Sequence, residues 1–313
     1  MSTRPVAVGV TPMETRREVV LRLATLAEEL GYTAFSVAEG WGLDAGVVLA
    51  EIATRTSRIE LGTGVLNVWG RSPASIAMLA AGLAEVSGGR FTLGLGAGSP
   101  QLAEGLHDVP FRAPVRRLGT VARQVRGLLA GERTTPTTGR GLRLAALPST
   151  PVPLQMAALG PAAVRLAGEV ADAWCPFLLP LSGLKQGMCL LEEGAARVGR
   201  PRPRVTPCIP IAMSHDVAAW WVVFYLTSMG PLYAATLREL GFGEAVDAVI
   251  AANGRGVPPT VPPAARVLVD ELLVTEREGL DRWRAAGADT PVLVLPPGRP
   301  VAELEQTLRA FSA

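Results

Sequence analysis

The sequence predicts an α/β fold, a (β/α)8 TIM barrel in which eight parallel strands alternate with helices. Short apolar runs alternate with longer amphipathic runs along most of the chain, which is typical of a parallel sheet covered by helices on both faces. The stretches RIELGTG and RFTLGLG, which begin at Arg58 and Arg90, repeat one pattern at the interval of a βα unit. Repetition of a whole unit favours a barrel, although the repeat alone leaves a doubly wound open sheet as the alternative.

The first half of the chain predicts strands and helices in strict alternation. A glycine, Gly31, ends the first predicted helix, Asp44 precedes the second as an N-cap, and Ser72 precedes the third as N-cap with proline at its first position. The strands are expected at 6–10, 34–38, 58–66 and 90–98, and the helices at 15–31, 44–57 and 72–89.

The second half predicts four more strands at less regular intervals. The strands are expected at 152–159, 172–177, 204–213 and 290–297, and the helices at 113–131, 160–171, 184–199 and 301–312. Residues 214–290 have helical patterns and a proline-rich hinge at 256–265. We therefore expect a single domain over residues 1–313, with a helical insertion at about 214–290 before the last strand.

The composition excludes several classes of protein. The chain is 49% hydrophobic and its net charge is only +2, with arginines dispersed and no basic stripe, which argues against a nucleic-acid partner. No apolar run reaches the roughly 18 residues of a membrane span, and the N-terminus lacks the apolar core of a signal peptide. Cys175, Cys189 and Cys208 are odd in number and form no CxxC pair. We therefore expect small core thiols in a reducing compartment, the cytoplasm.

The ends of four predicted strands combine glycine or alanine with a few polar residues. After strands two to five the chain reads AEGWGLDA, TGVLNVWGRSP, GLGAGSPQLAEG and AALGPAA. In a barrel these ends form the active site. Glycine inside a strand, as in RIELGTG, indicates a bulge or a close approach to the backbone. GLGAGS does not have the spacing of a dinucleotide-binding fingerprint.

This ordered set of segments resembles the bacterial-luciferase-like superfamily, and within it the actinobacterial oxidoreductases that use coenzyme F420. ATRTSRIELGTGVLNV and SPASIAMLAAGLAEVSGGRFTLGLGAG are similar to the family's third strand, third helix and fourth strand. GLHDVPFRAPVRRL is similar to its loop before helix four, and LGPAAVRLAGEVADAWCP to its phosphate site. The resemblance runs almost end to end. It implies a luciferase-like TIM barrel similar to methylenetetrahydromethanopterin reductase and F420-dependent glucose-6-phosphate dehydrogenase.

The resemblance also implies where the cofactor ring binds. In this family a cis, non-proline peptide bond in a bulge at the end of strand three backs the deazaflavin ring. The matching bond here is Gly64–Val65. Asn67 would then face the edge of the cofactor.

The remainder of the cofactor is expected along the next two strand ends. The resemblance implies that Gly98 and Ser99 approach the ribityl chain. It implies further that the backbone at Ala157, Ala158 and Gly160 binds the phosphate at the start of the fifth helix. The dipole of that helix favours an anion there.

One segment departs from the family pattern. The family's Asp-His pair after strand two corresponds here to Glu39 and Gly40, so a carboxylate remains and the histidine is missing. Glu39 is the first candidate for a catalytic acid or a cofactor-orienting group, because Trp41 and Trp69, expected to line the substrate pocket, would partly desolvate it. His107 is the second catalytic candidate, and a loop histidine with a backbone partner is the alternative for it.

The residues near these candidates also have structural explanations. Asp44 is more often a helix cap than a catalyst, and His215 is expected on the surface at the start of a helix. The aromatic segment 224–244, preceded by Trp220 and Trp221, is expected to form core or a dimer contact, and otherwise a lid over an apolar substrate.

The function implied by the resemblance is hydride transfer between reduced F420 and an activated C=C or C=N, or between an alcohol and its carbonyl, with the cofactor supplying the chemistry. The alternatives are an FMNH2-dependent monooxygenase and a non-catalytic paralogue, which the missing histidine keeps open. No metal-ligand spacing and no GxSxG motif occurs. The expected partners are a small-molecule substrate, suited to secondary metabolism, and a second copy in a homodimer, with neither nucleic acid nor membrane.

Overall fold

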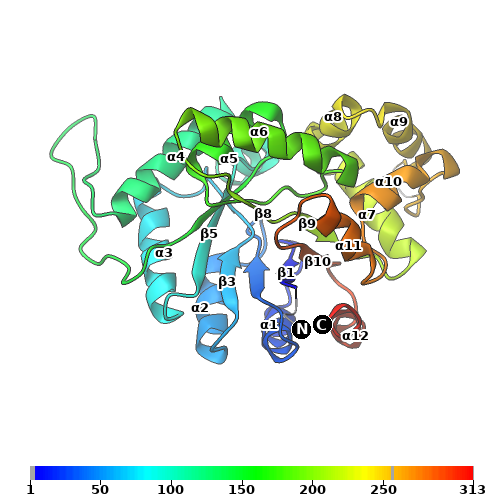
Figure 1. Cartoon of the computed structure of the whole chain (residues 1–313), viewed down its shortest axis with the longest axis horizontal. Coiled ribbons are helices and arrows are strands. Elements are labelled where there is room, and N and C mark those ends of the chain that lie inside the picture. The colour runs from blue at the N-terminus through cyan, green and yellow to red at the C-terminus, as the bar shows by residue number, and fades with distance from the viewer. Residues whose placement is uncertain (1–3, 255–256, 313) are drawn as a thin grey trace.

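The computed structural model describes residues 4–254 and 257–312, and it shows a parallel sheet surrounded by helices (Figure 1). The strands are β1 Ala7–Val10, β2 Ala34–Val37, β3 Glu60–Thr63, β4 Leu66–Asn67, β5 Phe91–Gly96, β6 Leu154–Ala157, β7 Ala173–Trp174, β8 Arg204–Val205, β9 Cys208–Pro210 and β10 Val292–Leu295. They pair in the order β8-β7-β6-β5-β3-β2-β1-β10-β9, and β4 pairs with β5.

The sheet closes on itself because residues 204–210, which hold β8 and β9, lie at both ends of this order. On one side the Cys208 N–H donates to Pro176 O at 2.8 Å, and on the other the Val292 N–H donates to Pro207 O at 2.9 Å. β3 and β4 are also two parts of one interrupted strand. The described strands therefore occupy eight positions of a closed barrel, which confirms the predicted fold and excludes the open doubly wound sheet.

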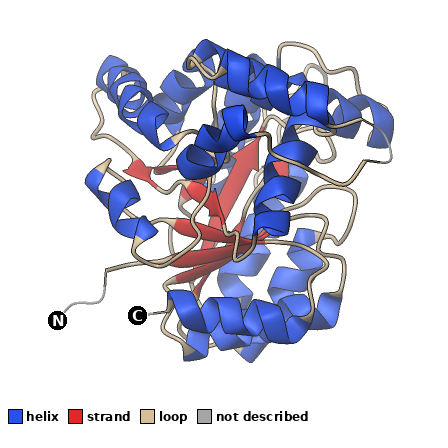
Figure 2. Cartoon of the chain, turned by 90° about the vertical axis from the view of Figure 1, so that its right-hand side faces the viewer, coloured by secondary structure: helices blue, strands red, loops and turns tan. Residues whose placement is uncertain are grey.

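The helices lie outside the strands, as Figure 2 shows. The predicted helix ends are confirmed: Gly31 has a φ of +80°, Asp44 accepts a hydrogen bond from the Val47 N–H, and Ser72 accepts one from the Ser75 N–H. The α-helices are α1 Arg17–Glu29, α2 Ala45–Arg55, α3 Pro73–Val86, α4 Pro114–Leu129, α5 Pro161–Val170, α6 Leu184–Arg197, α7 His215–Thr227, α8 Pro231–Glu239, α9 Gly243–Ala252, α10 Arg266–Leu272, α11 Gly279–Ala285 and α12 Val301–Phe311.

The predicted insertion between the last two strand positions contains α7 to α11, and its helices α7 to α10 form an apolar cluster apart from the main core. Trp221 and Tyr225 of α7 are buried in this cluster, which confirms that segment 224–244 contributes core. His215 is exposed at the start of α7, as expected. Gly256, the first residue of the predicted hinge, lies outside the described residues.

No single helix in the described part of the chain is long and apolar enough to span a membrane. α7 and α8 reach that length and hydropathy only as a pair, and the chain bends by 99° between them.

Along each strand, successive side chains point alternately toward the surrounding helices and into the bore of the barrel. Large side chains such as Phe35, Leu61 and Met156 are buried in the main core beneath the helices. Alternate positions face the bore, and several of them are small; a Cβ on Gly9, for example, would lie 2.8 Å from Ser36 Oγ. The main core is therefore the layer between sheet and helices.

The cysteines have no disulfide, and they differ in burial. Cys175 is buried and Cys208 is partly buried. Cys189 is exposed on α6, so the prediction that all three are core thiols is wrong for this residue. Cys189 lies on the solvent-facing side of α6, where its side chain is left uncovered.

Candidate active site

The candidate site is built around the break between β3 and β4, near the C-terminal edge of the barrel. The peptide bond Gly64–Val65 is cis, as the resemblance implies. Thr63 fixes the strand before it, because Oγ1 accepts a hydrogen bond from the Gly94 N–H at 2.7 Å and donates to Gly94 O at 2.9 Å. The Glu39 N–H donates to Val65 O at 3.2 Å. The bulge is therefore held by the strand on one side and by the loop after β2 on the other.

Two glycines of β5 make room for the side chain of Val65. A Cβ on Gly94 would overlap the Thr63 carbonyl oxygen and lie 3.0 Å from Val65 Cγ1, and a Cβ on Gly96 would lie 2.7 Å from Val65 Cγ2. Real Cβ atoms do not pack this closely. The Leu-Gly-x-Gly pattern of β5 thus has a direct packing reason.

Asn67 organises the turn that follows the bulge. Its side chain is buried, and Oδ1 accepts hydrogen bonds from the Trp69 N–H at 2.9 Å and the Gly70 N–H at 3.0 Å. The side-chain Nδ2 therefore faces His107 Nε2, at 3.4 Å, and is the donor. A neutral His107 then carries its proton on Nδ1. A Cβ on Gly70 would lie 2.5 Å from the His107 ring, so this glycine admits the imidazole.

The two tryptophans predicted to line the substrate pocket lie in different surroundings. Trp69 is buried, and its Nε1 donates to Ala97 O at 2.6 Å. Its ring is 5.1 Å from that of Phe111, and the Arg117 guanidinium lies 4.6 Å from its centroid. Trp41 is 51% exposed. Trp69 is thus packed in the interior beside the loop after β5, whereas Trp41 is open to solvent.

Glu39 forms an ion pair with Arg71, a residue that the sequence pattern did not single out. Arg71 donates to Glu39 Oε1, and it also donates to Asp44 Oδ2 at 2.6 Å. The other Glu39 oxygen accepts the Ala45 N–H at 3.1 Å. Burial by itself lowers the pKa of Arg71, but its bonds to the two carboxylates outweigh burial and raise that pKa. The loop after β2 and the loop after β3 are therefore joined by charge.

The space beside Gly40, the position of the missing family histidine, is filled from the loop after β1. A Cβ on Gly40 would lie 2.7 Å from Pro12 Cβ. No side chain at position 40 fits while Pro12 keeps its place. Pro12, in the loop after β1, therefore occupies the space that a histidine side chain at position 40 would need.

Gly98 and Ser99 begin the loop after β5, beside Asn67. Gly98 has a φ of +65°, and a Cβ there would lie 3.3 Å from Asn67 Cβ. Ser99 Oγ accepts a hydrogen bond from the Leu102 N–H at 3.4 Å. This bond precedes a π-helix, Gln101–Leu106, which the sequence pattern did not predict.

The predicted phosphate site lies between β6 and α5. Ala157 ends β6, and the Ala158 carbonyl accepts a hydrogen bond from Trp174 Nε1 at 2.9 Å. Gly160 is the N-cap of α5, has no side-chain cap, and has no atom within 4 Å of where a Cβ would stand. Within the described residues, neither Ala158 nor Gly160 donates its N–H to a protein acceptor. Free N–H groups at a helix start bind anions.

Comparison with known proteins places this geometry in a family. The model of the luciferase-like monooxygenases matches residues 3–274 of the chain. The chain belongs to this family.

The luciferase-like relatives include proteins that depend on F420. A protein of Mycobacterium tuberculosis named as a coenzyme F420-dependent oxidoreductase is 30% identical, over 95% of each chain. The coenzyme F420-dependent tetrahydromethanopterin reductase from Methanopyrus kandleri has a similar structure, with a TM-score of 0.79, 20% identity, and 98% and 97% of the two chains covered. An F420-dependent secondary alcohol dehydrogenase gives 0.76 at 19% identity, over 98% and 97%. The resemblance and the luciferase-like barrel are confirmed.

A buried polar atom at the C-terminal end of β1 lacks a hydrogen-bond partner in the described structure. Thr11, directly after β1, is 4% exposed, and its Oγ1 has no hydrogen-bond partner in the described structure. Buried polar atoms are rarely left in this state. Together with the open N-terminus of α5, this orphaned hydroxyl fits a site that a polar cofactor completes. A single threonine after a strand carries no signal in the sequence, so Thr11 was missed.

Proposed function

We propose that this chain is an F420-dependent oxidoreductase that acts on an activated C=C or C=N, or interconverts an alcohol and a carbonyl. The observation that carries the proposal is the near full-length likeness to the F420-dependent relative. When bound, the deazaflavin supplies the hydride chemistry at C5.

Four groups of residues are proposed to hold the cofactor. The backbone at Gly64 and Val65 backs the ring, and Asn67 faces its edge. Gly98 and Ser99 lie along the ribityl chain, because their loop packs against Asn67. The Ala157–Ala158 backbone and Gly160 receive the phosphate, where uncapped N–H groups and the dipole of α5 favour an anion.

Glu39 and His107 are proposed to have different roles. Glu39 is held by Arg71 and by the Ala45 N–H, which suits the orienting role rather than that of a free acid. His107 Nε2 lies 3.4 Å from Asn67 Nδ2, which leaves Nδ1 as the nitrogen that can carry the proton of the neutral ring. We therefore propose that His107 Nδ1 transfers the proton.

We also propose a class of substrate, an oligomeric state and a cellular location. The turn between α7 and α8 reaches the loop after β5, since a Cβ on Gly230 would lie 3.2 Å from Gln101 Nε2. The insertion therefore covers part of the mouth, and we place a small apolar substrate, of the kind found in secondary metabolism, between it, Trp41 and Trp69. We further propose a homodimer and a cytoplasmic location, the latter because the described cysteines are free thiols.

An anaerobic turnover assay tests the reaction. Reduced F420 is mixed with the enzyme and a panel of enones, imines and ketones, and the return of oxidised F420 fluorescence is followed without oxygen. We expect oxidation that depends on both enzyme and acceptor. Turnover only with reduced FMN and only with oxygen would indicate the monooxygenase instead.

A further inference from the structure

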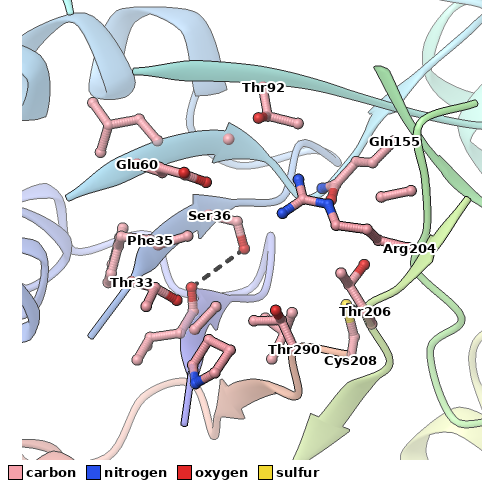
Figure 3. Close-up of a pocket in the computed structure, with 18 residues that line it drawn as sticks. Thr33, Phe35, Ser36, Glu60, Thr92, Gln155, Arg204, Thr206, Cys208 and Thr290 are labelled. Carbon is pink, nitrogen blue, oxygen red and sulfur yellow. Dashed lines mark hydrogen bonds between the residues drawn. The ribbon is translucent and has the colours of Figure 1, made fainter. Parts of the chain in front are cut away.

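A second cavity opens at the opposite end of the barrel from the candidate active site. It has a volume of about 250 Å³ (Figure 3). Its walls include residues at the first positions of several strands, among them Ala7, Ala34, Glu60 and Ala173. The cofactor groups proposed above lie beyond the far ends of the strands. This cavity is therefore a separate space.

The cavity exists because small residues occupy bore positions. TIM barrels commonly fill the bore with bulky branched side chains, whereas here Ala7, Ala34, Gly62 and Ala173 leave it hollow. One water needs only about 10–15 Å³ of such space, so there is room for an organic molecule. The walls also carry polar side chains that can contact one: Ser36, Thr92, Gln155, Thr206 and Thr290.

Two opposite charges face each other across this space. Glu60 begins β3 and Arg204 begins β8, and these strands stand four positions apart in a barrel of eight, on opposite walls. Figure 3 shows both side chains directed toward the cavity, and both residues are exposed to solvent at its opening. Within the described residues, neither forms an ion pair. The neighbouring acids Asp172 and Asp289 are already bound by other arginines.

We propose that this cavity binds a small zwitterion of the amino-acid type. Its carboxylate would meet the Arg204 guanidinium, which suits a carboxylate geometrically, and its ammonium group would meet the Glu60 carboxylate. A simple anion would face Glu60 without compensation, and a simple cation would face Arg204. The hydroxyl groups of Thr92 and Thr290, which bond no described protein atom, are available to the middle of the ligand.

Isothermal titration of the purified full-length protein tests the class of ligand. The probes are glycine, 4-aminobutyrate and 6-aminohexanoate, which differ in the distance between their charges. Butyrate and butylamine are the single-charge comparators. We expect saturable binding of at least one zwitterion, about tenfold or more tighter than either comparator, because each lacks one charge-assisted contact. No binding by any zwitterion, or equal binding of butyrate, would overturn the proposal.

Three variants locate the binding. Arg204→Gln and Glu60→Gln should each weaken the zwitterion by about tenfold or more, while the double exchange Arg204→Glu with Glu60→Arg should restore it, since the ligand can reverse. Arg58→Gln removes an exposed arginine that does not line the cavity and is the matched control. Unchanged F420 affinity in all of them separates this site from the candidate active site. Native-like binding by both single variants would contradict the assignment.

Discussion

Arg71 forms an ion pair with Glu39, whose side chain is only 9% exposed. The same guanidinium bonds Asp44, the N-cap of α2, at 2.6 Å. Because the Glu39 N–H also donates to Val65 O, the pair braces the bulge that ends β3. A single arginine thus connects a helix cap, a carboxylate and the proposed ring-binding backbone.

Replacing this arginine should therefore affect both stability and the site. Arg71→Met leaves the nearly buried Glu39 without its partner, and we expect a loss of about 2–4 kcal/mol in the free energy of unfolding. F420 affinity should also fall by about tenfold or more, since about 1.4 kcal/mol of lost positioning has that effect. Urea denaturation and fluorescence titration measure the two. The control Arg55→Gln removes an exposed pair with Glu51 and should cost less than about 1 kcal/mol; equal effects would refute the brace.

His107→Gln and Glu39→Gln should separate proton transfer from positioning. With cofactor saturating, we expect His107→Gln to lower kcat by about 100-fold or more. Its F420 affinity should stay near native. Glu39→Gln should weaken F420 binding and keep most of kcat at saturation. Steady-state kinetics over pH 5–9 decide the matter, and the reverse pattern would make Glu39 the acid.

The packing of Val65 against β5 predicts a rescue. Gly96→Ala places a Cβ 2.7 Å from Val65 Cγ2, so the bulge must shift, at a cost of about 1–3 kcal/mol in stability. Cofactor affinity should fall as well. Adding Val65→Ala removes the overlapping methyl group and should recover most of both losses. Thermal unfolding and titration of the single and double variants test this, and additive losses would show that Val65 is not the contact.

Gly160→Glu should abolish F420 binding while the protein stays folded. No atom lies within 4 Å of a Cβ at this position, and its φ of −69° suits any residue, so the fold has no reason to change. The added carboxylate would repel a phosphate at the start of α5. Gly160→Ala is the uncharged control, and Gly82→Glu adds the same charge to the exposed face of α3. Native affinity in folded Gly160→Glu would place the phosphate elsewhere.

Asp172 predicts a pH-dependent part of the stability. Burial alone raises the pKa of its carboxyl, but the Leu154 N–H and the Arg126 and Arg200 guanidinium groups outweigh burial and lower it. A lowered pKa stabilises the fold above the ordinary carboxyl value, and that contribution disappears as pH falls through the lowered pKa.

Asp172→Asn should accordingly lose about 1–2 kcal/mol near pH 7, allowing for screening of the partly exposed arginines. The difference from native protein should shrink below about pH 4. Urea denaturation at both pH values measures it. A difference that does not change with pH would mean that the charge of Asp172 is not what stabilises the strand.

Patterns along the chain predicted the strands and helices because their signals are local. The apolar runs at β1 and β10 and the caps at Asp44 and Ser72 are read from neighbouring residues. Family motifs located the Gly64–Val65 bond and the start of α5.

Contacts between side chains that lie far apart in the sequence could not be predicted from local patterns. Arg71 binds Glu39 across 32 positions, and Pro12 fills the space at Gly40 from the loop after β1. The orphaned hydroxyl of Thr11 exists only because closure of the barrel buries it. The cavity between Glu60 and Arg204 likewise depends on which strands stand opposite each other.

Competitive binding of F420 and FMN to the purified protein tests the central claim most directly. Fluorescence titration should give a dissociation constant for F420 at least about tenfold lower than that for FMN, and Gly160→Glu should lose the F420 signal. Tight FMN binding without F420 binding would contradict the account in favour of the monooxygenase. Binding of neither would contradict it in favour of a non-catalytic paralogue.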